Sequence, residues 1–473
     1  MIFLTLTGKT MAENRRLWEE NSRFADGAEL RADFLLPGER ALAASFPAET
    51  GVPVILTCRK PEDGGHWTDS EETRTAFFRS QIGSGFSFFD FEKDYEFPEA
   101  EELSKAGIRI IRSFHDFTGC PAGFSDFLIR VNSRGEIPKA AVTVVSAAEL
   151  AGFFEKSRAL TFPKIVLAMG PFGFPSRILT EFSGSMITYC SPDGAPAAPG
   201  QISPREAVEI YRYREINRET ALYAVTGNPL TQSRSPEIHN AYLKKRGLDA
   251  VFLPFQATSY DDFMVSANRL GIRGAAVTVP FKEAAAAAAD AASFDVRSCG
   301  AANTVLFRNG KTEAHNTDIG GFLKLLSEAV PSVKGKKCLV FGAGGAAAAC
   351  VCALATRGAE VTVLNRTPEK AQRLAERFGC GFGNLEAAAG IEDADILVQA
   401  SAAGMLDFEA VDPAAAYRYR GDEVVCDIVY KPRETPFLKR AAAAGCRCLY
   451  GIGMLEAQAQ LQFELFYPEE PVV

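Results

Sequence analysis

The sequence predicts an α/β protein that begins with a (β/α)8 barrel and continues into a second α/β region. Its 473 residues are enough for two or three domains. Short apolar runs recur at fairly even spacing through about the first 200 residues, with helical patterns between several of them. In the second half, a glycine-rich turn lies inside a complete strand–turn–helix–strand unit over residues 336–367.

Eight of the apolar runs in the first half are strand candidates. They are Ile2–Leu6, Ala28–Arg31, Val52–Thr57, Phe86–Asp90, Ile108–Phe114, Ile137–Thr143, Lys164–Met169 and Met186–Tyr189. Helical stretches such as Glu99–Lys105 and Ala147–Ser157 lie between them. A closed barrel of eight parallel strands places its chemistry at the C-terminal ends of the strands.

A loop is predicted at residues 195–200, where glycine and proline cluster. The charge-rich segment Ser203–Glu219 is predicted to be a helix that runs from the barrel into a linker. A new alternating pattern starts at Ala221, so the barrel domain is expected to span residues 1–215. Alanine runs such as Ala284–Ala289 are expected to form short helices, because alanine is the strongest helix former.

The composition is that of a soluble globular protein, with 47% hydrophobic and 23% charged residues. A net charge of −8 without a basic block argues against nucleic acid or an anionic membrane as partner. No apolar run approaches the ~18 residues of a membrane helix, and the short apolar N-terminus is expected to be a strand rather than a signal or transit segment. The 11 cysteines lack zinc-knuckle spacing, so reduced thiols and a cytoplasmic location are expected.

Lys139 lies within an apolar strand candidate, Ile137–Thr143. Burial lowers the pKa of a lysine, and the free amine can attack a ketone to form a Schiff base. A lysine that only extends from a strand end into solvent is the alternative for this residue taken alone. His115 and Asp116 follow the strand candidate Ile108–Phe114, and a histidine in that place is suited to proton transfer near neutral pH.

Other charged residues also collect at the ends of strand candidates. They are Glu29 and Arg31 on the second strand, Arg59 at the end of the third, Glu62 and Asp63 before a Gly-Gly pair, and Arg177 after the seventh. One lysine, one histidine, carboxylates and arginines gathered in this way predict a site for an anionic ketone substrate.

Six segments of the first half resemble type I 3-dehydroquinate dehydratases and occur in the order found in that family. They read GAELRADF, TCRKPEDGG, SFHDFTG, GEIPKAAV, FPSRI and APGQI. The resemblance covers about residues 1–215 and implies an imine between Lys139 and the substrate carbonyl. It implies that His115 removes the proton α to the imine and later protonates the departing hydroxyl, with Asp63 or Glu62 orienting the histidine. Because the imine serves as the electron sink, no metal is needed.

The resemblance also implies which groups bind the substrate. Arg177 and Arg59 hold the carboxylate and hydroxyls. Glu29 and Arg31 lie behind these two arginines. Gln201 closes over the substrate from the last loop.

Two positions depart from the pattern of that family. Asp63 stands where glutamate is common, one methylene shorter, and Ala197 replaces the serine of the lid. We expect weaker affinity rather than an inactive site, since one lost hydroxyl costs about 0.5–1.5 kcal/mol. Ala197→Ser should therefore lower the Michaelis constant for the substrate. An unchanged constant in steady-state assays would contradict this interpretation.

In the second half, the glycine-rich turn Gly342–Gly345 leads into a helix candidate that begins at Ala346. Glycine lets the backbone approach a pyrophosphate, and a helix N-terminus favours its negative charge. The strand candidate that follows ends without the Asp or Glu typical of an NAD site. Instead, Asn365, Arg366 and Thr367 can bind a 2′-phosphate, which favours NADP; a plain surface loop is the alternative.

Polar residues suited to a hydroxy-acid substrate are spread through the second half. Ser233 and Ser235 precede a helix, where they can bind a carboxylate, although helix capping is the commoner explanation. Lys282 follows a strand candidate, and Asp318 lies in the segment HNTDIG. A Lys/Asp pair can relay a proton to and from a secondary alcohol during hydride transfer. Gln458, near the end of the chain, is expected to contribute its side-chain amide to the same site.

This ordered set resembles the shikimate dehydrogenases over about residues 220–473. The resemblance implies a Rossmann-type NADP domain over residues 326–454 and a shikimate-binding domain over residues 220–325 with 455–473. The resemblance implies that shikimate is bound by Ser233, Ser235, Thr278, Lys282, Asn303, Asp318 and Gln458. Within this set, it implies that Lys282 and Asp318 transfer the proton. It implies that NADP is bound by Gly342, Gly344, Gly345, Ala346, Asn365, Arg366 and Thr367. It also implies that the nicotinamide side is lined by Ser401, Met405, Ile428, Tyr430, Gly451 and Met454. Ala276 in place of a usual asparagine, and Ala348 in place of a basic residue, bear on cofactor affinity.

The two resemblances together imply consecutive reactions on small molecules. 3-Dehydroquinate loses water to give 3-dehydroshikimate, which NADPH then reduces to shikimate. Two alternatives stay open: a second half that prefers quinate or NAD, and a metabolite sensor that keeps both folds without turnover. The sensor interpretation expects the loss of Lys139, His115, Lys282 or Asp318, and all four are present.

Overall fold

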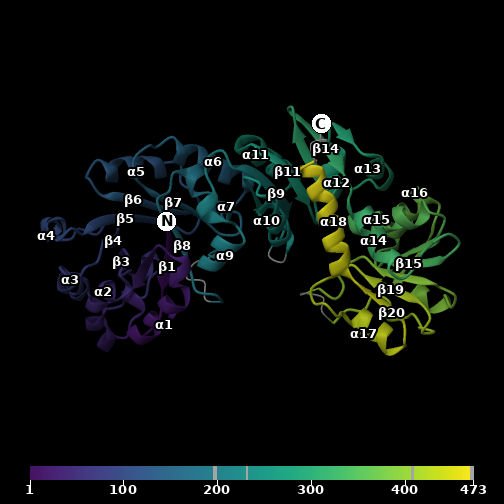
Figure 1. Ribbon diagram of the computed structural model, residues 1–473, viewed down its shortest axis with the longest axis horizontal. Helices are drawn as coiled ribbons and strands as arrows, with labels where there is room; N and C mark the ends of the chain where they lie inside the picture. The colour runs from purple at the N-terminus through teal and green to yellow at the C-terminus, as the bar shows by residue number, and fades with distance from the viewer. Residues whose placement is uncertain (195–199, 231–232, 406–409, 469–473) are drawn as a thin grey trace. The chain divides into compact units, whose positions relative to one another are not determined.

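The computed structural model describes residues 1–194, 200–230, 233–405 and 410–468 (Figure 1). The chain forms two compact units. Unit 1 contains Met1–Leu222 together with Leu243–Gly271, and unit 2 contains Tyr223–Tyr242 together with Ile272–Val473. Strands and helices alternate in both units, which confirms the predicted α/β class.

Eight parallel strands in unit 1 form a nearly closed barrel, as predicted. They are β1 Ile2–Leu6, β2 Gly27–Arg31, β3 Val54–Thr57, β4 Phe88–Glu92, β5 Arg109–Asp116, β6 Ile137–Thr143, β7 Ile165–Met169 and β8 Thr188–Cys190. Their order is β7-β6-β5-β4-β3-β2-β1-β8. An isolated parallel bridge between Lys164 and Ser185 joins the segments that lead into β7 and β8. Each strand begins and ends within two residues of its predicted bounds.

Helices follow most of the barrel strands. They are α1 Met11–Asn21, α2 Phe46–Thr50, α3 Glu71–Ser80, α4 Ala100–Lys105, α5 Phe124–Asn132, α6 Ala147–Arg158, α7 Pro175–Ile178, α8 Thr180–Ser183 and α9 Pro204–Glu209. Serine side chains cap α3, α6 and α9 by accepting hydrogen bonds from backbone N–H groups of the first turn. Aromatic side chains pack the helices against the strands; Phe78 of α3, for example, contacts Phe89 and Phe91 of β4.

The predicted helix over Ser203–Glu219 is wrong in its length. The helix α9 ends at Glu209, and only a short 3-10 turn, Tyr213–Glu215, follows it. Arg212 adopts a φ of 52°, which is outside the helical region. The hydroxyl of Tyr213 lies 2.8 Å from that of Thr180. This tertiary contact holds the chain against the barrel, so it overrides the local helical preference of a charge-rich segment.

The second sheet has six strands in the order β10-β9-β11-β13-β14-β12. They are β9 Ala221–Gly227, β10 Ala250–Gln256, β11 Ile272–Val277, β12 Ala291–Ala292, β13 Thr304–Arg308 and β14 Lys311–His315. The accompanying helices are α10 Ser235–Arg246, α11 Tyr260–Leu270, α12 Lys282–Ala288, α13 Phe294–Cys299 and α14 Asp318–Ser327. The segment that contains β10 and α11 belongs to unit 1, because α11 packs on α6. There the Asp262 carboxylate accepts hydrogen bonds from the N–H groups of Ala147 and Ala148.

The third sheet has the strand order of a Rossmann fold, β17-β16-β15-β18-β19-β20, and all its pairs are parallel. Its strands are β15 Lys337–Phe341, β16 Glu360–Leu364, β17 Gly381–Gly383, β18 Ile396–Gln399, β19 Val424–Asp427 and β20 Arg447–Tyr450. Helices α15 Gly345–Ala355, α16 Pro368–Phe378, α17 Pro436–Ala443 and α18 Gly451–Phe466 complete it. Alternate residues of β15 enter two separate apolar clusters, so both faces of the sheet are buried.

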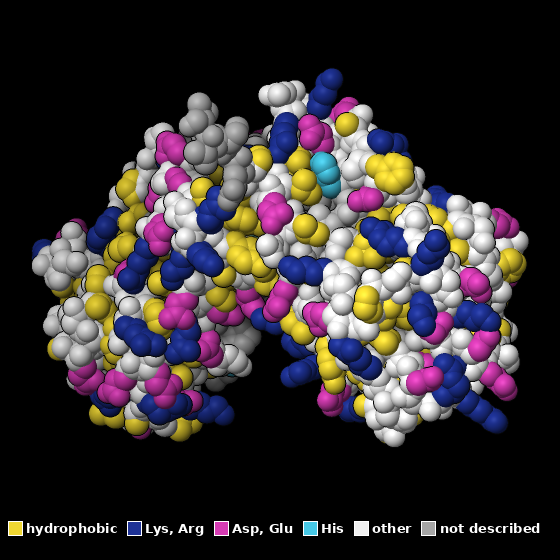
Figure 2. Space-filling model, turned by 45° about the vertical axis from the view of Figure 1, so that its right-hand side comes forward, with side chains coloured by type: hydrophobic (Ala, Val, Ile, Leu, Met, Phe, Trp, Pro, Cys, Tyr) yellow, Lys and Arg dark blue, Asp and Glu magenta, His cyan; other side chains and the backbone are white. Residues whose placement is uncertain are grey.

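The surface agrees with the charge distribution of the sequence. On the face that Figure 2 shows, basic and acidic side chains are interspersed. Within the described residues, the helices are too short or too polar for any of them to cross a membrane.

Candidate active sites

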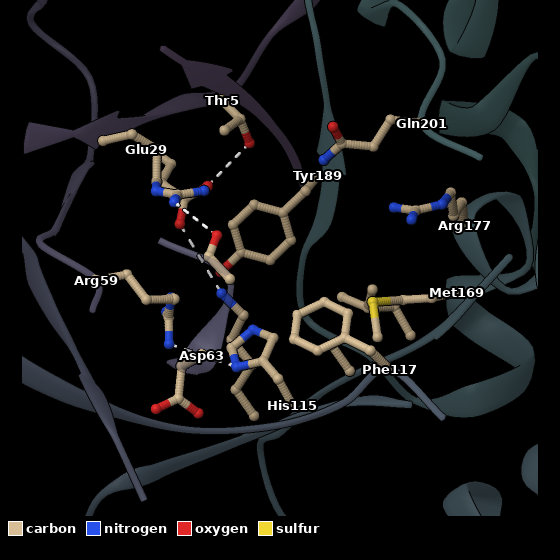
Figure 3. A pocket seen from close by; sticks show the side chains of 15 residues that line it. Thr5, Glu29, Arg59, Asp63, His115, Phe117, Met169, Arg177, Tyr189 and Gln201 are labelled. Atoms are coloured by element: carbon tan, nitrogen blue, oxygen red, sulfur yellow. Dashed lines mark hydrogen bonds and ion pairs between the residues drawn. The ribbon is translucent and has the colours of Figure 1, made fainter. Parts of the chain in front are cut away.

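A cavity lies at the C-terminal ends of the barrel strands (Figure 3). Eight of the residues predicted from the sequence line it: Glu29, Arg31, Arg59, Asp63, His115, Lys139, Arg177 and Gln201. Thr5, Phe117, Met169 and Tyr189 also line it, and the sequence interpretation missed them. Their position at or just beyond the ends of β1, β5, β7 and β8 was the signal that could have found them.

Lys139 points into this cavity from β6 and is 5% exposed. Its Nζ donates a hydrogen bond of 2.7 Å to Asp90 Oδ2 and lies 3.9 Å from Glu29 Oε1. The same nitrogen lies 4.2 Å from the centre of the Tyr189 ring. Two carboxylates and an aromatic face therefore surround the amine, so its charge is compensated in a buried place.

Asp90 was not predicted, although it holds the centre of the site together. It accepts hydrogen bonds from Lys139, from Arg59 Nη2 at 2.7 Å and from the hydroxyl of Ser113. Burial alone would raise the pKa of Asp90, but Arg59 and Lys139 outweigh it and hold the pKa below its usual value. The signal in the sequence was a carboxylate among the phenylalanines of β4, which must be paired when it is buried.

His115 lies at the end of β5, with Nδ1 3.4 Å from Arg59 Nη1. Burial lowers the pKa of His115 well below its usual value, and the positive charges of Arg59 and Lys139 lower it further. The imidazole is therefore uncharged near neutral pH and is able to accept a proton.

Asp63, and not Glu62, lines the cavity. It closes a short turn, Pro61–Asp63, and in the described residues it makes no hydrogen bond to His115. Burial and the nearby Glu92 raise the pKa of Asp63. Its shorter side chain, one methylene less than glutamate, is consistent with this separation from the imidazole.

The three arginines have different environments. Arg31 makes two hydrogen bonds to Asp33, of 2.9 and 2.7 Å, and Arg59 is bound to Asp90. Burial lowers the pKa of Arg177 to about 10, and an anion bound beside it would favour its charged form. Figure 3 shows Arg177 and Gln201 across the cavity from Glu29 and Arg59. Ala197, the predicted lid residue, lies outside the described residues.

In unit 2, four residues from separate segments meet. Lys282, the first residue of α12, lies with Nζ 2.5 Å from Asp318 Oδ2 at the start of α14. The other oxygen of Asp318 accepts a hydrogen bond of 2.8 Å from Asn303 Nδ2. The same amide group lies 3.2 Å from Gln458 Oε1 of α18. All four of these residues were predicted from the sequence as one site.

The remaining predicted substrate groups are Thr278, which follows β11 and lies beside the end of β9, and the two serines after β9. Thr278 donates its backbone N–H to Thr226 O, and a Cβ on Gly227 would lie 2.4 Å from Thr278 Cγ2. Ser233 and Ser235 lie at the start of α10, where Ser235 N donates to Ser233 Oγ at 3.4 Å. Among the described residues, the side-chain hydrogen bonds of Asp318 come from Lys282 and Asn303 and not from these serines.

The glycine-rich turn fits a dinucleotide. Gly342 has a φ of 125°, and a Cβ there would lie 2.6 Å from Ala400 O. Gly344 precedes α15 without a side-chain cap, so the first N–H groups of the helix are not covered by a capping side chain. A Cβ on Gly345 would lie 3.2 Å from both Cβ and Cδ of Lys282. The turn therefore passes directly beside the Lys282–Asp318 pair, with Ala346 in the first turn of the helix.

The other predicted cofactor residues lie at neighbouring strand ends. Asn365, Arg366 and Thr367 follow β16; Arg366 and Thr367 are exposed, and Asn365 Nδ2 donates to Thr367 O. The residues predicted for the nicotinamide side are Ser401 and Met405 after β18, Ile428 and Tyr430 after β19, and Gly451 and Met454 at the start of α18. A Cβ on Gly451 would lie 2.5 Å from Ile428 O, and one on Gly342 would lie 3.2 Å from Ser401 Cβ. An exposed guanidinium beyond β16 and an open helix N-terminus fit a 2′-phosphate and a pyrophosphate.

Three family models match the chain in order. Residues 2–218 match type I 3-dehydroquinase, residues 225–305 match the shikimate dehydrogenase substrate-binding domain, and residues 324–435 match shikimate/quinate 5-dehydrogenase. A shikimate biosynthesis protein AroDE from Chlamydia pneumoniae is 32% identical over 71% of this chain and 68% of its own. The chain belongs to the type I 3-dehydroquinase and shikimate dehydrogenase families.

Two further relatives match this chain over different shares of its length. A bifunctional 3-dehydroquinate dehydratase/shikimate dehydrogenase of Arabidopsis thaliana, named as chloroplastic, is 29% identical over 93% of this chain and 77% of its own. An NADP(+)-dependent shikimate dehydrogenase of Methanopyrus kandleri is 39% identical over 54% of this chain and 94% of its own. The 3-dehydroquinase barrel and the shikimate dehydrogenase half thus occur together in other chains in the same order.

Proposed function

We propose that the chain dehydrates 3-dehydroquinate to 3-dehydroshikimate in the barrel and reduces 3-dehydroshikimate to shikimate, with NADPH, in the second half. Membership of both families supports this pair of reactions. The single observation that carries the proposal is the pairing of each predicted amine with its proton-handling partners. Lys139 shares one cavity with His115, and Lys282 lies 2.5 Å from Asp318 beside the glycine-rich turn.

In the barrel, Lys139 Nζ attacks the substrate ketone and forms an imine with loss of water. His115 then takes the proton α to the imine, since its imidazole is held uncharged. The electron pair moves into the imine, and expulsion of the hydroxyl follows, with His115 returning the proton to it. Water then hydrolyses the imine, releases 3-dehydroshikimate and restores Lys139. The balance is the net loss of one water molecule from the substrate.

The other cavity residues position the substrate and Lys139. Asp90 and Glu29 hold the amine, and Glu29 is itself fixed by hydroxyls of Thr5 and Thr57 at 2.9 and 2.8 Å. Arg177 binds the substrate carboxylate, with Gln201 on the same side of the cavity. Arg59 and Arg31 bind hydroxyl groups while they remain paired with Asp90 and Asp33.

The uncharged state of His115 gives a direct prediction. Because burial and two neighbouring cations lower its pKa, the imidazole should stay neutral from pH 8 down to below pH 6.5. In an NMR titration, the His115 ring signals, assigned by comparison with His115→Gln, should show no protonation step in that range. A midpoint at or above pH 6.5 would contradict a buried imidazole flanked by the charges of Arg59 and Lys139.

In the second half, bound NADPH would supply the hydride that reduces the ketone of the substrate. Lys282 Nζ donates a proton to the carbonyl oxygen, which thereby becomes the alcohol, and Asp318 holds Lys282 for this transfer. Asn303 and Gln458 orient the substrate around this pair. The N-terminus of α15 binds the pyrophosphate, and Arg366 with Asn365 and Thr367 binds the 2′-phosphate.

A coupled assay tests the whole proposal. Wild-type protein given 3-dehydroquinate and NADPH should oxidise NADPH, as should protein given 3-dehydroshikimate and NADPH. Activity on 3-dehydroshikimate alone would remove the dehydratase half of the proposal. Assays with NADH in place of NADPH, and with quinate in place of shikimate, test the alternatives for the second half. No activity on any substrate would favour the interpretation as a metabolite sensor.

The proposed domains are residues 1–215, residues 220–325 with 455–473, and residues 326–454. The assignment of residues 455–473 to the second of these domains is supported by α18, which contacts the helix α14 and the strands β11 and β13 of the second sheet (Figure 1). The cytoplasmic location expected from the sequence stays a prediction.

A further inference from the structure

A second glutamine of α18 lies one helical turn beyond Gln458. Gln462 is 1% exposed, and its Nε2 donates to Asn303 O at 2.9 Å and to Thr304 Oγ1 at 3.0 Å. A carbonyl oxygen only accepts hydrogen bonds, so the Nε2 side of the amide must face Asn303. The orientation of the Gln462 amide is thereby fixed, and its Oε1 faces His239.

His239 completes this arrangement from α10. Its Nε2 lies 3.1 Å from Gln462 Oε1, and it is 1% exposed. An amide oxygen accepts only, so the imidazole carries its hydrogen on Nε2. Burial lowers the pKa of His239 to about 4, so the ring is a neutral donor throughout the working pH range. Within α10, His239 lies one turn after Ser235.

The same network sets the orientation of the Asn303 side chain. The Thr304 hydroxyl, which accepts from Gln462, donates to Asn303 Oδ1 at 2.9 Å. The backbone N–H of Thr317 donates to the same oxygen at 2.7 Å. With Oδ1 occupied in this way, Nδ2 of Asn303 must face Asp318 Oδ1, 2.8 Å away.

We propose that His239 and Gln462 are positioning residues for the dehydrogenase reaction. The pair joins the first turns of α10, which carry Ser235, to Asn303 and through Asn303 to Asp318. It therefore sets the spacing between the serines that bind the substrate carboxylate and the residues that move the proton. This inference rests on the proposed dehydrogenase function and assigns no contact with substrate to either residue.

Matched variants at position 239 test the role of the donor. His239→Gln keeps an N–H near the place of the imidazole Nε2, whereas His239→Leu removes it and leaves a buried amide oxygen of Gln462 without that donor. For His239→Leu we expect a KM for shikimate about tenfold higher and a KM for NADP+ within about twofold of wild type. His239→Gln should recover the wild-type KM for shikimate to within about threefold. Gln462→Met should behave as His239→Leu does and decides the question if His239→Leu does not fold.

The dehydratase reaction of the same chain is the internal control. Its rate on 3-dehydroquinate reports the amount of intact chain with a folded barrel, and the thermal unfolding curve of each variant reports whether unit 2, which contains His239 and Gln462, is folded. A purely structural role would lower kcat with both Michaelis constants unchanged, and that result would overturn the inference. Equal behaviour of His239→Gln and His239→Leu would also overturn it. A wild-type protein that fails to reduce NADP+ with shikimate would overturn the proposed function, and the inference with it.

Discussion

Lys139→Ala should abolish the dehydration of 3-dehydroquinate, with kcat at least about 10⁴-fold lower, while reduction of 3-dehydroshikimate stays within about twofold of wild type. The physical reason is that covalent catalysis needs the amine itself. Asp90 and Glu29 hold that amine in place but offer no nucleophile to the ketone. The measurement is a coupled NADPH assay with each substrate in turn.

Borohydride trapping provides an independent readout for this variant. Reduction of the imine should attach the substrate carbon skeleton to wild-type protein, and mass spectrometry should locate it on the peptide that contains Lys139. Lys105→Ala, a change at an exposed lysine of α4, is the matched control and should be trapped like wild type. Trapping of the Lys139→Ala protein would show that a different lysine forms the imine.

Lys282→Ala should lower the oxidation of shikimate by NADP+ by about 10³-fold, with dehydratase kinetics unchanged. Lys282 is the amine that exchanges the proton with the secondary alcohol, because it is the only cation that forms an ion pair with Asp318 among the described residues. Steady-state rates with shikimate and NADP+ measure the effect. Asp318→Asn should also lower the rate of shikimate oxidation.

The exposed Lys324 of α14 supplies the control for this experiment. It lies on the helix that begins with Asp318, and Lys324→Ala should leave both reactions within about twofold of wild type. A Lys282→Ala protein that keeps more than about a tenth of wild-type kcat would contradict the assigned proton transfer, because general acid–base groups contribute at least about 10²-fold.

The eight barrel strands and the Rossmann-type unit could be predicted because their signals are local. Buried parallel strands require continuous apolar runs, and the turn at Gly342 requires a residue without a Cβ. The end of the helix predicted over Ser203–Glu219 could not be found from a local signal of this kind. Its end depends on the contact of Tyr213 with Thr180, which is remote in the chain.

The sequence by itself determined the fold class and the cofactor type, and it predicted most of the residues that the structure brings together in the two candidate sites, because each of these leaves a characteristic pattern of residues along the chain. Only the tertiary structure decided which side chains meet. It brought Asp63 rather than Glu62 to the barrel cavity, placed Asp90 within hydrogen-bond distance of Lys139, and joined His239 through Gln462 to Asn303. A hydrogen bond depends on distances of a few ångströms between atoms of distant segments, and no local pattern in the chain encodes those distances.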